Sequence, residues 1–316
     1  MKIFILITLI FFSLFASEMR KPSAQYISSG AVVDLVYKNN FIYSATDTGC
    51  VDIFDIKTKK LVQKIKVPKI KDFMGDEVDS KVYSVDVIDN KILILSQAKQ
   101  GFRRIHIYQN GNMELIIPYT KNLSIAKAKF LNKNTLLLAL LSNELIYYDI
   151  KNQKQNWMVQ SSGAKFSNFV LNEDKTKVVV ADESGDLKIH STIDGSKLKV
   201  LSGQNLDNVF QVDYKNSIIA SAGQDRRVVI YNTRLDTAYY KNSSFLIYSV
   251  GLSPSGKLAA YSSDENNNIT VFNTATKSTM GRFTGNKMTL TNILFISENE
   301  FFVSSDDDTI NLYKIK

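Results

Sequence analysis

The chain repeats one pattern at a nearly constant interval, and this interval constrains the fold more than any other feature. Each copy contains an apolar residue followed by an aromatic residue or histidine. The second residues of these pairs are Phe54, Tyr108, Tyr148, His190, Tyr231, Phe272 and Tyr313. From Tyr108 onward they lie 40, 42, 41, 41 and 41 residues apart, whereas the first interval is 54. A repeat of this length predicts an array of similar units, each packed on its neighbours.

The copy at residues 209–232 shows most clearly what one unit contains. Three runs rich in β-branched and aromatic residues are separated by Lys215-Asn216 and by the segment from Gly223 to Asp225. Such runs are typical of short strands, and the residues between them favour tight turns. A helix of this length would carry Gly223 and clustered β-branched residues without caps, which argues against it. We therefore expect strands throughout the repeat.

Every copy opens on a run with apolar residues at its first, fourth and sixth positions. The seven sets are Val32/Leu35/Tyr37, Val82/Val85/Val87, Ile125/Ala128/Phe130, Phe166/Phe169/Leu171, Val209/Val212/Tyr214, Ile247/Val250/Leu252 and Leu290/Ile293/Phe295. A weaker fourth run closes six copies, at residues 61–67, 114–117, 155–159, 198–201, 238–240 and 279–283. Four strands in about 40 residues are the signature of a propeller blade.

The seventh copy lacks a fourth run, because it stops after its third strand at Lys316. Residues 24–29 form a strand-like run that belongs to no copy. Pairing these two segments would complete the last blade and remove two open strand edges. We therefore predict an all-β protein in which residues 18–316 form one seven-bladed β-propeller, with its last blade closed by an N-terminal strand.

The N-terminal segment predicts export. Lys2 is followed by the apolar run 3–15 and by Ala16-Ser17, the pattern of a secretory signal at residues 1–17. Retention of this segment as an anchor is the alternative, because Leu14 stands where a small residue is expected before the cleavage site. With the signal removed, we expect a periplasmic protein.

The lone Cys50 cannot form an internal disulfide, and we interpret it as a small strand residue.

The charge pattern limits the class of partner. The net charge is +8, but the basic residues stand singly or in pairs, as in Lys59-Lys60. Nucleic-acid binding requires a basic stripe with aromatic residues, so we expect none. We expect membrane contact to be peripheral at most and the partner to be a protein.

The repeats resemble those of the WD-repeat family. The carriers are residues 221–232 and 304–313, each with an Asp before the third strand, and the hairpin at 253–260. There is no Gly-His pair and no Trp-Asp pair, so we expect the hydrogen-bonded His-Ser-Trp-Asp network of that family to be missing. The whole exported chain also resembles the NapL family of accessory proteins found with periplasmic nitrate reductases. That resemblance implies a non-catalytic role, with a nitrate reductase component or maturation factor as partner.

One polar residue stands directly before the second apolar position of each opening strand. These residues, the channel ring, are Asp34, Ser84, Lys127, Asn168, Gln211, Ser249 and Asn292. The first strand of a propeller blade is innermost, so the ring is expected to line the central channel. It either meets water there or forms a site for a small ligand or metal. Asp34 is its one carboxylate, too few for a hard cation that prefers about six oxygens.

No arrangement of residues predicts catalysis. His106 and His190 are the only histidines, and they fall on third strands of different blades. Neither a two-histidine metal site nor a Ser-His-Asp set can be assembled from them. Trp157 stands alone, which argues against propeller enzymes with a quinone cofactor. We expect no enzyme, metal or cofactor, with a lactonase or hydrolase that uses the channel as the alternative.

An insertion at residues 68–81 follows the first copy and should project from the ring. Phe73 and Met74 stand in it within a frame of charged residues that includes Asp76 and Glu77. Aromatic residues and Met are enriched in interface cores, with charge at the rim. These four residues are therefore the predicted partner-binding site. The alternative is that Phe73 folds back and caps the first two blades.

Overall fold

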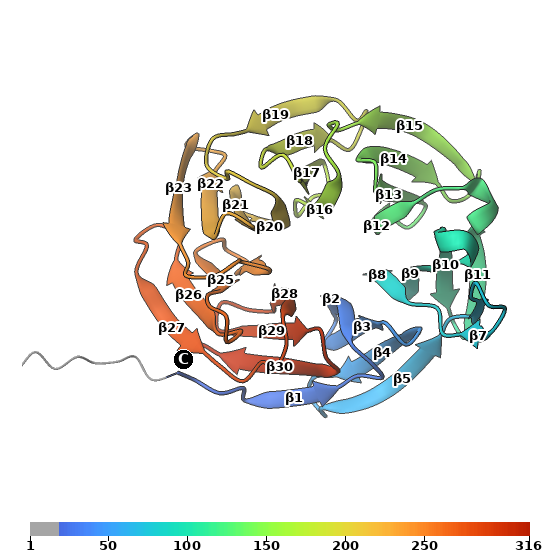
Figure 1. Ribbon diagram of the computed structural model, residues 1–316, viewed down its shortest axis with the longest axis horizontal. Helices are drawn as coiled ribbons and strands as arrows, with labels where there is room; N and C mark the ends of the chain where they lie inside the picture. Colours follow the sequence, from blue (N-terminus) through green and yellow to red (C-terminus); the bar gives the residue numbers. More distant parts are fainter. Residues whose placement is uncertain (1–18) are drawn as a thin grey trace, which may run out of the picture.

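The computed structural model describes residues 19–316, so the predicted signal lies outside the described residues. In that part of the chain, seven four-stranded antiparallel sheets are arranged as the blades of a propeller around a central channel (Figure 1). The predicted all-β class and the number of blades are confirmed. No helix in residues 19–316 is long and apolar enough to cross a membrane.

Six blades are built from four consecutive strands, the first innermost and the fourth outermost. Blade 1 has β2 (Val32–Lys38), β3 (Phe41–Thr46), β4 (Cys50–Asp55) and β5 (Lys60–Lys66). Blade 2 has β8 (Val82–Ile88), β9 (Lys91–Gln97), β10 (Arg103–Gln109) and β11 (Asn112–Ile117). Blade 3 has β12 (Ile125–Asn132), β13 (Thr135–Leu140), β14 (Glu144–Asp149) and β15 (Lys154–Gln160). Blade 4 has β16 (Phe166–Leu171), β17 (Lys177–Asp182), β18 (Leu187–Ser191) and β19 (Lys197–Leu201).

The remaining blades follow the same plan except at the closure. Blade 5 has β20 (Val209–Lys215), β21 (Ile218–Gly223), β22 (Arg227–Asn232) and β23 (Thr237–Asn242). Blade 6 has β24 (Val250–Leu252), β25 (Leu258–Ser262), β26 (Ile269–Asn273) and β27 (Thr279–Phe283). Blade 7 has β28 (Leu290–Phe295), β29 (Glu300–Ser305), β30 (Thr309–Lys314) and, outermost, β1 (Ala24–Ile27). Two single-turn 3₁₀ helices, η1 (Lys99–Gly101) and η2 (Tyr119–Lys121), lie in connections.

The alternation of strand direction sorts the connections onto two faces of the ring. Links between blades, and links from second to third strands, lie on one face, which we call the hairpin face. Links from first to second and from third to fourth strands lie on the opposite face, the turn face. Residues 68–81 form a link between blades, so they belong to the hairpin face.

A β-bulge at the same place in six blades explains the spacing of the opening strands. In blade 1 the pairing of β2 with β3 shifts register between Val32 and Asp34. The equivalent shift precedes Ser84, Lys127, Asn168, Gln211 and Asn292. A bulge adds one residue to the strand and re-aims the side chain that follows it. Two apolar residues therefore stand three apart across the bulge, and alternation by two resumes after it, at Leu35 and Tyr37.

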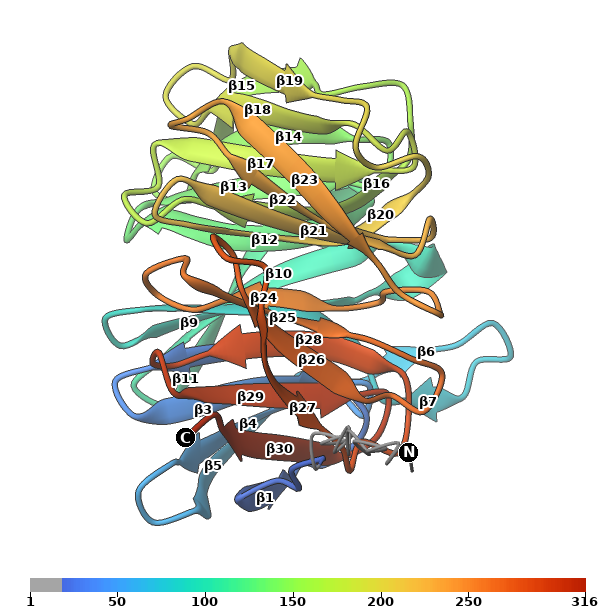
Figure 2. The same cartoon turned by 90° about the vertical axis from the view of Figure 1, so that its left-hand side faces the viewer.

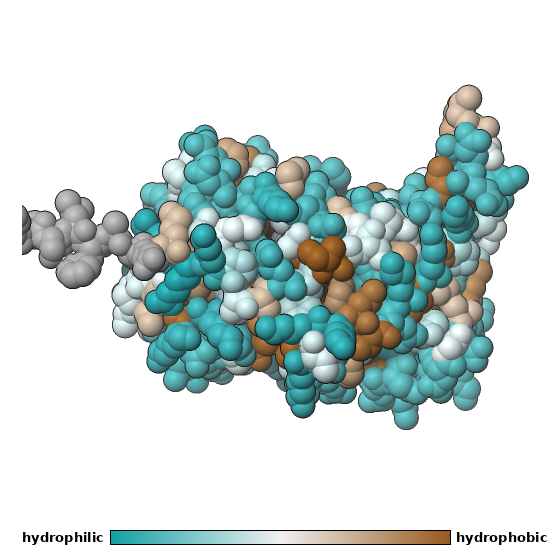
Figure 3. Space-filling view, turned by 90° about the horizontal axis from the view of Figure 1, so that it is seen from below, coloured by the Kyte–Doolittle hydropathy of each residue, from teal (hydrophilic) through white to brown (hydrophobic). Residues whose placement is uncertain are grey.

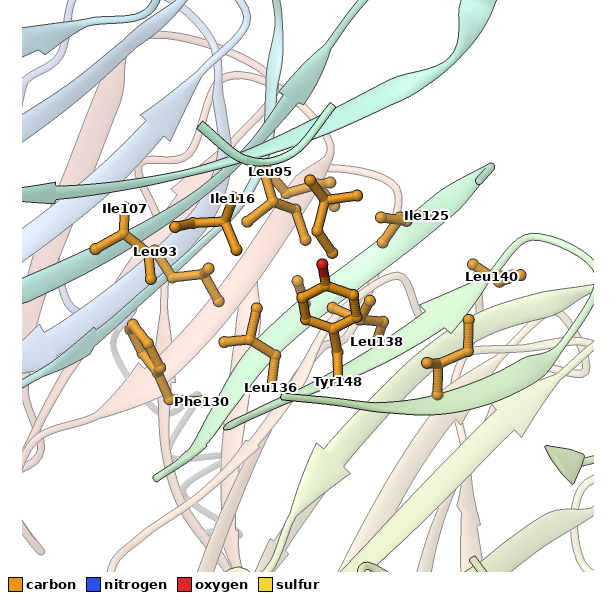
Figure 4. Packing of buried hydrophobic residues seen from close by; sticks show 14 residues of the cluster. Leu93, Leu95, Ile107, Ile116, Ile125, Phe130, Leu136, Leu138, Leu140 and Tyr148 are labelled. Carbon is orange, nitrogen blue, oxygen red and sulfur yellow. The ribbon is translucent and has the colours of Figure 1, made fainter. Parts of the chain in front are cut away.

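The hydrophobic core is divided among the seven interfaces between consecutive blades. Seven buried clusters are found in residues 19–316, and each joins the facing sides of two neighbouring sheets. Figure 4 shows the cluster between blades 2 and 3, where Leu93 and Ile107 meet Phe130 and Leu136. Every blade is therefore held by apolar burial on two sides.

The closure of the ring by the N-terminal strand is confirmed. β1 lies beside β30 and runs antiparallel to it (Figure 1). In the register of this pair, Gln25 is opposite Asn311. Tyr26 is 2% exposed and meets the rings of Phe54 and Phe302 edge-on, each at 5.7 Å between centroids. The strand ends at Ile27, two residues before the end of the predicted run. The Ser28 amide continues this register by donating to Asp308 O at 2.8 Å, and the Ser29 amide then donates to Asp52 of blade 1 at 2.6 Å.

Residues other than the His-Ser-Trp-Asp set of the WD-repeat family form buried hydrogen bonds in several blades. In blade 5, Asn205 donates to the hydroxyl of Tyr231 at 3.1 Å and accepts from Ser221 at 2.9 Å. In blade 4, Ser161 Oγ lies 3.1 Å from Nε2 of His190. Smaller polar sets of other residues therefore anchor the third strands in these blades.

Candidate functional site

Two cavities open into the channel, one from each face of the ring. The hairpin-side cavity has a volume of about 320 Å³ and the turn-side cavity about 500 Å³. Five residues of the channel ring line both cavities, namely Asp34, Lys127, Asn168, Gln211 and Asn292. The other two are fully buried and bond to neighbours. Ser84 Oγ donates to Ala128 O at 3.1 Å, and Ser249 Oγ donates to Gln211 Oε1 at 2.6 Å.

Asp34 forms a partly buried ion pair across the channel. Its carboxylate lies 3.1 Å from the ammonium of Lys129 and accepts a hydrogen bond from the Val85 amide at 3.0 Å. Burial raises the pKa of Asp34, but the positive charges of Lys129 and Lys127 outweigh it, so the net pKa is lowered. Burial lowers the pKa of Lys129, whereas the charges of Asp34 and Asp86 raise it, and the net pKa is raised. The pair is therefore ionised, and Asp34 ties blade 1 to blades 2 and 3.

Lys127 is held differently, because its hydrogen bonds go to neutral oxygens. Its Nζ donates to Asn168 Oδ1 at 2.7 Å and to Phe169 O at 2.9 Å. Burial, with a smaller contribution from the like charge of Lys129, lowers the pKa of Lys127 to about 8. At neutral pH the channel therefore holds an ammonium that pays a desolvation cost without a contacting carboxylate.

Amide and carboxylate oxygens of the inner strands also fasten one blade to the next. Gln211 Oε1 accepts from the Val250 amide at 2.8 Å, and Asp213 accepts from the Leu252 amide at 2.8 Å. Asp86 accepts from the Phe130 amide at 2.7 Å in the same way. The polar inner strands are thus a seam between blades as well as the wall of a channel.

Arg103, Tyr83 and Lys129 also line the channel cavities, although they were not predicted as channel residues. Arg103 follows η1 at the start of β10, and its guanidinium lies 3.8 Å from the centroid of the Tyr83 ring at the hairpin-side cavity. Lys129 could have been predicted, because side chains two residues apart on a strand lie on the same face and Lys127 was already assigned to the channel. No local pattern marked Arg103, because its position depends on the approach of a third strand to the mouth.

The histidines and the cysteine lie away from the channel. His106 is on β10 and His190 on β18, and both are buried. Burial and the charge of Arg104 lower the pKa of His106 to about 4. Burial raises the pKa of Cys50. In residues 19–316, no three His, Cys, Asp or Glu side chains come together in a way that could hold a metal ion.

The insertion at 68–81 forms a hairpin that stands off the ring. β6 (Ile70–Lys71) pairs with β7 (Glu77–Val78), and the tip projects beyond the hairpin face in both side views (Figures 2 and 3). Phe73 is 101% exposed and Met74 is 80% exposed. Phe73 therefore does not cap the first two blades, and that alternative is wrong. The apolar side chains stand free at the tip because the short strands hold it away from the sheets.

The tip is ordered by its own hydrogen bonds. Asp72 Oδ1 accepts from the amides of Met74 and Asp76, both at 2.9 Å, and the Asp72 amide donates to Asp76 O at 2.9 Å. Gly75 takes a φ of +91°, which other residues adopt only with strain. At the base, Arg104 donates to Pro68 O. Phe73 is therefore presented by a turn that is already formed.

No protein-family model matches the chain, and no curated protein matches it. The seven-bladed propeller is consistent with the resemblance to WD-repeat proteins. The resemblance to the NapL family rests on the sequence features alone.

Proposed function

We propose that the protein is a non-catalytic docking module of the periplasm, whose protein partner binds the hairpin face around Phe73 and Met74. The full exposure of Phe73 on an ordered tip carries this proposal. An exposed aromatic side chain gains most from burial at an interface, and a formed turn loses little entropy on binding. The carboxylates of Asp76 and Glu77 supply the charged rim of the contact.

The identity of the partner rests on the resemblance to NapL. It supports a component or maturation factor of the periplasmic nitrate reductase system as the partner. The partner's matching surface would be an apolar pocket that receives Phe73, framed by basic groups that face Asp76 and Glu77.

The test measures binding of the purified periplasmic nitrate reductase to the protein by calorimetry. A double variant, Phe73→Ser with Met74→Ser, is expected to bind about thirtyfold more weakly or worse, because a hot-spot side chain contributes about 2 kcal/mol or more. Its melting temperature should not change, since neither side chain is packed. Ile193→Ser is the control, because Ile193 is 78% exposed in a link on the turn face.

Equal binding by the double variant would refute the role of the hairpin. Absence of binding by the wild-type protein would refute nitrate reductase as the partner. A dimer of the wild-type protein that the double variant abolishes would assign the hairpin to self-association instead.

The contacts of the channel favour docking over the hydrolase alternative. Asp34 is held by Lys129 and Val85, so it serves as a structural carboxylate. Asn168 accepts the hydrogen bond of Lys127. These contacts give both residues a role that requires no substrate.

A further inference from the structure

The hairpin-side cavity combines a polar wall and an apolar wall. Lys127, Asn168 and Arg103 contribute hydrogen-bond donors, whereas Leu141 and Phe166 contribute apolar surface. A volume of about 320 Å³ is suited to a small molecule. A ligand here would touch blades 2, 3 and 4, on the face that carries the β6–β7 hairpin.

Two cations at this cavity lack a carboxylate in direct contact. Asp34 also lines it, but its carboxylate already pairs with Lys129. Neither Lys127 nor Arg103 forms an ion pair within residues 19–316. Asp34, Asp86 and Asp213 act on Lys127 only from a distance, so the opening of the cavity holds two cations without a contacting carboxylate.

The hydrogen bonds also leave donors unused. Lys127 Nζ makes two bonds and has a third hydrogen. Arg103 donates through Nη1 to Gly101 O and Phe102 O, and its Nη2 makes no bond within residues 19–316. Asn168 accepts through Oδ1, while its Nδ2 donates to no group of the same residues. Donors in excess, with two of them charged, favour an anionic acceptor.

Fixed positions distinguish this site from a loose patch of surface lysines. The guanidinium of Arg103 is stacked on Tyr83, and the ammonium of Lys127 is tied to β16 through Asn168 and Phe169. Such groups are already oriented before a ligand arrives, so little side-chain entropy is lost on binding.

We propose that the hairpin-side cavity binds a small organic carboxylate, with its oxygens on Lys127, Arg103 and Asn168 and its alkyl part against Leu141 and Phe166. The carboxylate supplies the acceptors that the two cations lack, and the alkyl part covers the apolar wall. An inorganic oxyanion would satisfy only the polar wall. Binding is therefore expected to depend on both the charge and the carbon chain.

Calorimetry on the whole protein tests the proposal with three probes at pH 7. Butyrate is the expected ligand, butyramide has nearly the same shape without the charge, and sulfate has the charge without the alkyl chain. We expect butyrate to bind at least tenfold more tightly than either of the others. Lys127→Met should weaken butyrate binding about tenfold or more, whereas Lys154→Met, at an exposed site on the same blade, should leave it unchanged.

The wild-type protein gives a second measurement that needs no variant. Because the pKa of Lys127 lies at about 8, raising the pH from 7 to 9.5 removes its charge and should weaken butyrate binding at least tenfold. Bound butyrate should also raise the pKa of Lys127, read from the ¹³Cε chemical shift of labelled lysine. Arg103→Gln should weaken binding at both pH values.

Three results would overturn the proposal. They are no butyrate binding by the wild-type protein, equal binding of butyrate and sulfate, and butyrate binding that persists unchanged at pH 9.5 and in Lys127→Met. Loss of butyrate binding would leave partner docking at the hairpin intact, because Phe73 does not line this cavity.

Discussion

Two tyrosines at equivalent positions of the repeat, Tyr148 and Tyr231, differ in whether their hydroxyl groups have a hydrogen-bond partner. The hydroxyl of Tyr148 lies among the aliphatic side chains between blades 2 and 3, and no group in residues 19–316 bonds to it (Figure 4). The hydroxyl of Tyr231 accepts a hydrogen bond from Asn205. Burial raises the pKa of both phenols, so both are neutral.

We expect Tyr148→Phe to raise the free energy of unfolding by about 1 kcal/mol, because it removes a buried polar group that makes no hydrogen bond. Tyr231→Phe should lower it by about 1 kcal/mol, because Asn205 then loses its acceptor. Urea unfolding of both variants measures the difference. A loss of stability in Tyr148→Phe would show that its hydroxyl has a partner, such as a buried water.

The channel ring shows how far single residues could be predicted. The sequence placed all seven residues of the channel ring on inner strands, because they hold a fixed position in the repeat. Six lie there, and Ser249 directly precedes β24. It could not predict that Ser84 and Ser249 are buried, since short side chains bond within the wall. It also missed Arg103, which reaches the channel mouth through the packing of β10 and not through the repeat.

At the scale of elements, β1 is the strand that completes blade 7 and closes the propeller. It is only four residues long, and most of its burial comes from Tyr26. The sequence predicted this pairing because one blade lacked a strand and one strand lacked a blade. The predicted run extended to residue 29. The Ser28 amide still bonds to Asp308 in the register of β30, and the hydrogen bonds of Ser29 to Asp52 then hold the chain as it turns toward blade 1.

We expect Tyr26→Ala to lower the free energy of unfolding by about 3 to 5 kcal/mol, the range for a large buried aromatic side chain. The cavity would open between Phe54 and Phe302, at the seam of the ring. Ile27→Ala is the matched control, because Ile27 is the next residue and is 58% exposed. It should change stability by less than about 0.5 kcal/mol. Chemical denaturation compares the two, and equal effects would show that Tyr26 does not anchor the strand.

The hairpin shows the opposite limit of prediction from sequence. Its length and position predicted that it projects, and it does. The choice between a cap and an exposed tip depended on whether Phe73 could reach the sheets. The pairing of β6 with β7 holds the tip away from the sheets, and Asp72 fixes its turn, contacts that composition does not reveal.

For the molecule as a whole, the number of blades followed from the seven copies of the repeat, and the size of each blade followed from their interval. The interval is set by the chain length needed for four strands and their turns, so a constant interval leaves little freedom in the fold. The partner is not encoded in this way, because propellers with the same core carry different surfaces.

Acid should destabilise the whole ring before its carboxylates titrate. Burial lowers the pKa of both His106 and His190, that of His106 from 6.5 to about 4. Between these values the unfolded chain binds more protons than the folded one, so stability falls as pH falls. The loss should begin near pH 6.5 and reach up to about 3 kcal/mol for His106 near pH 4.

Urea midpoints between pH 7 and pH 4 measure this dependence. His106→Leu should flatten it, since the buried ring is replaced by a side chain that does not titrate. An identical slope in the variant and the wild-type protein would contradict the assigned role of His106.

The pairing of β1 with β30 has a consequence for synthesis. β1 leaves the ribosome before every other described strand, whereas β30 leaves last, and Gln25 bonds to Asn311 across 286 positions of the chain. Blades 1 to 6 can form in order, but β1 must wait for nearly the whole chain. A polypeptide that stops short of β30 leaves two sheet edges unpaired, which invites aggregation or degradation. The propeller can therefore close only in a chain that has been translated through β30.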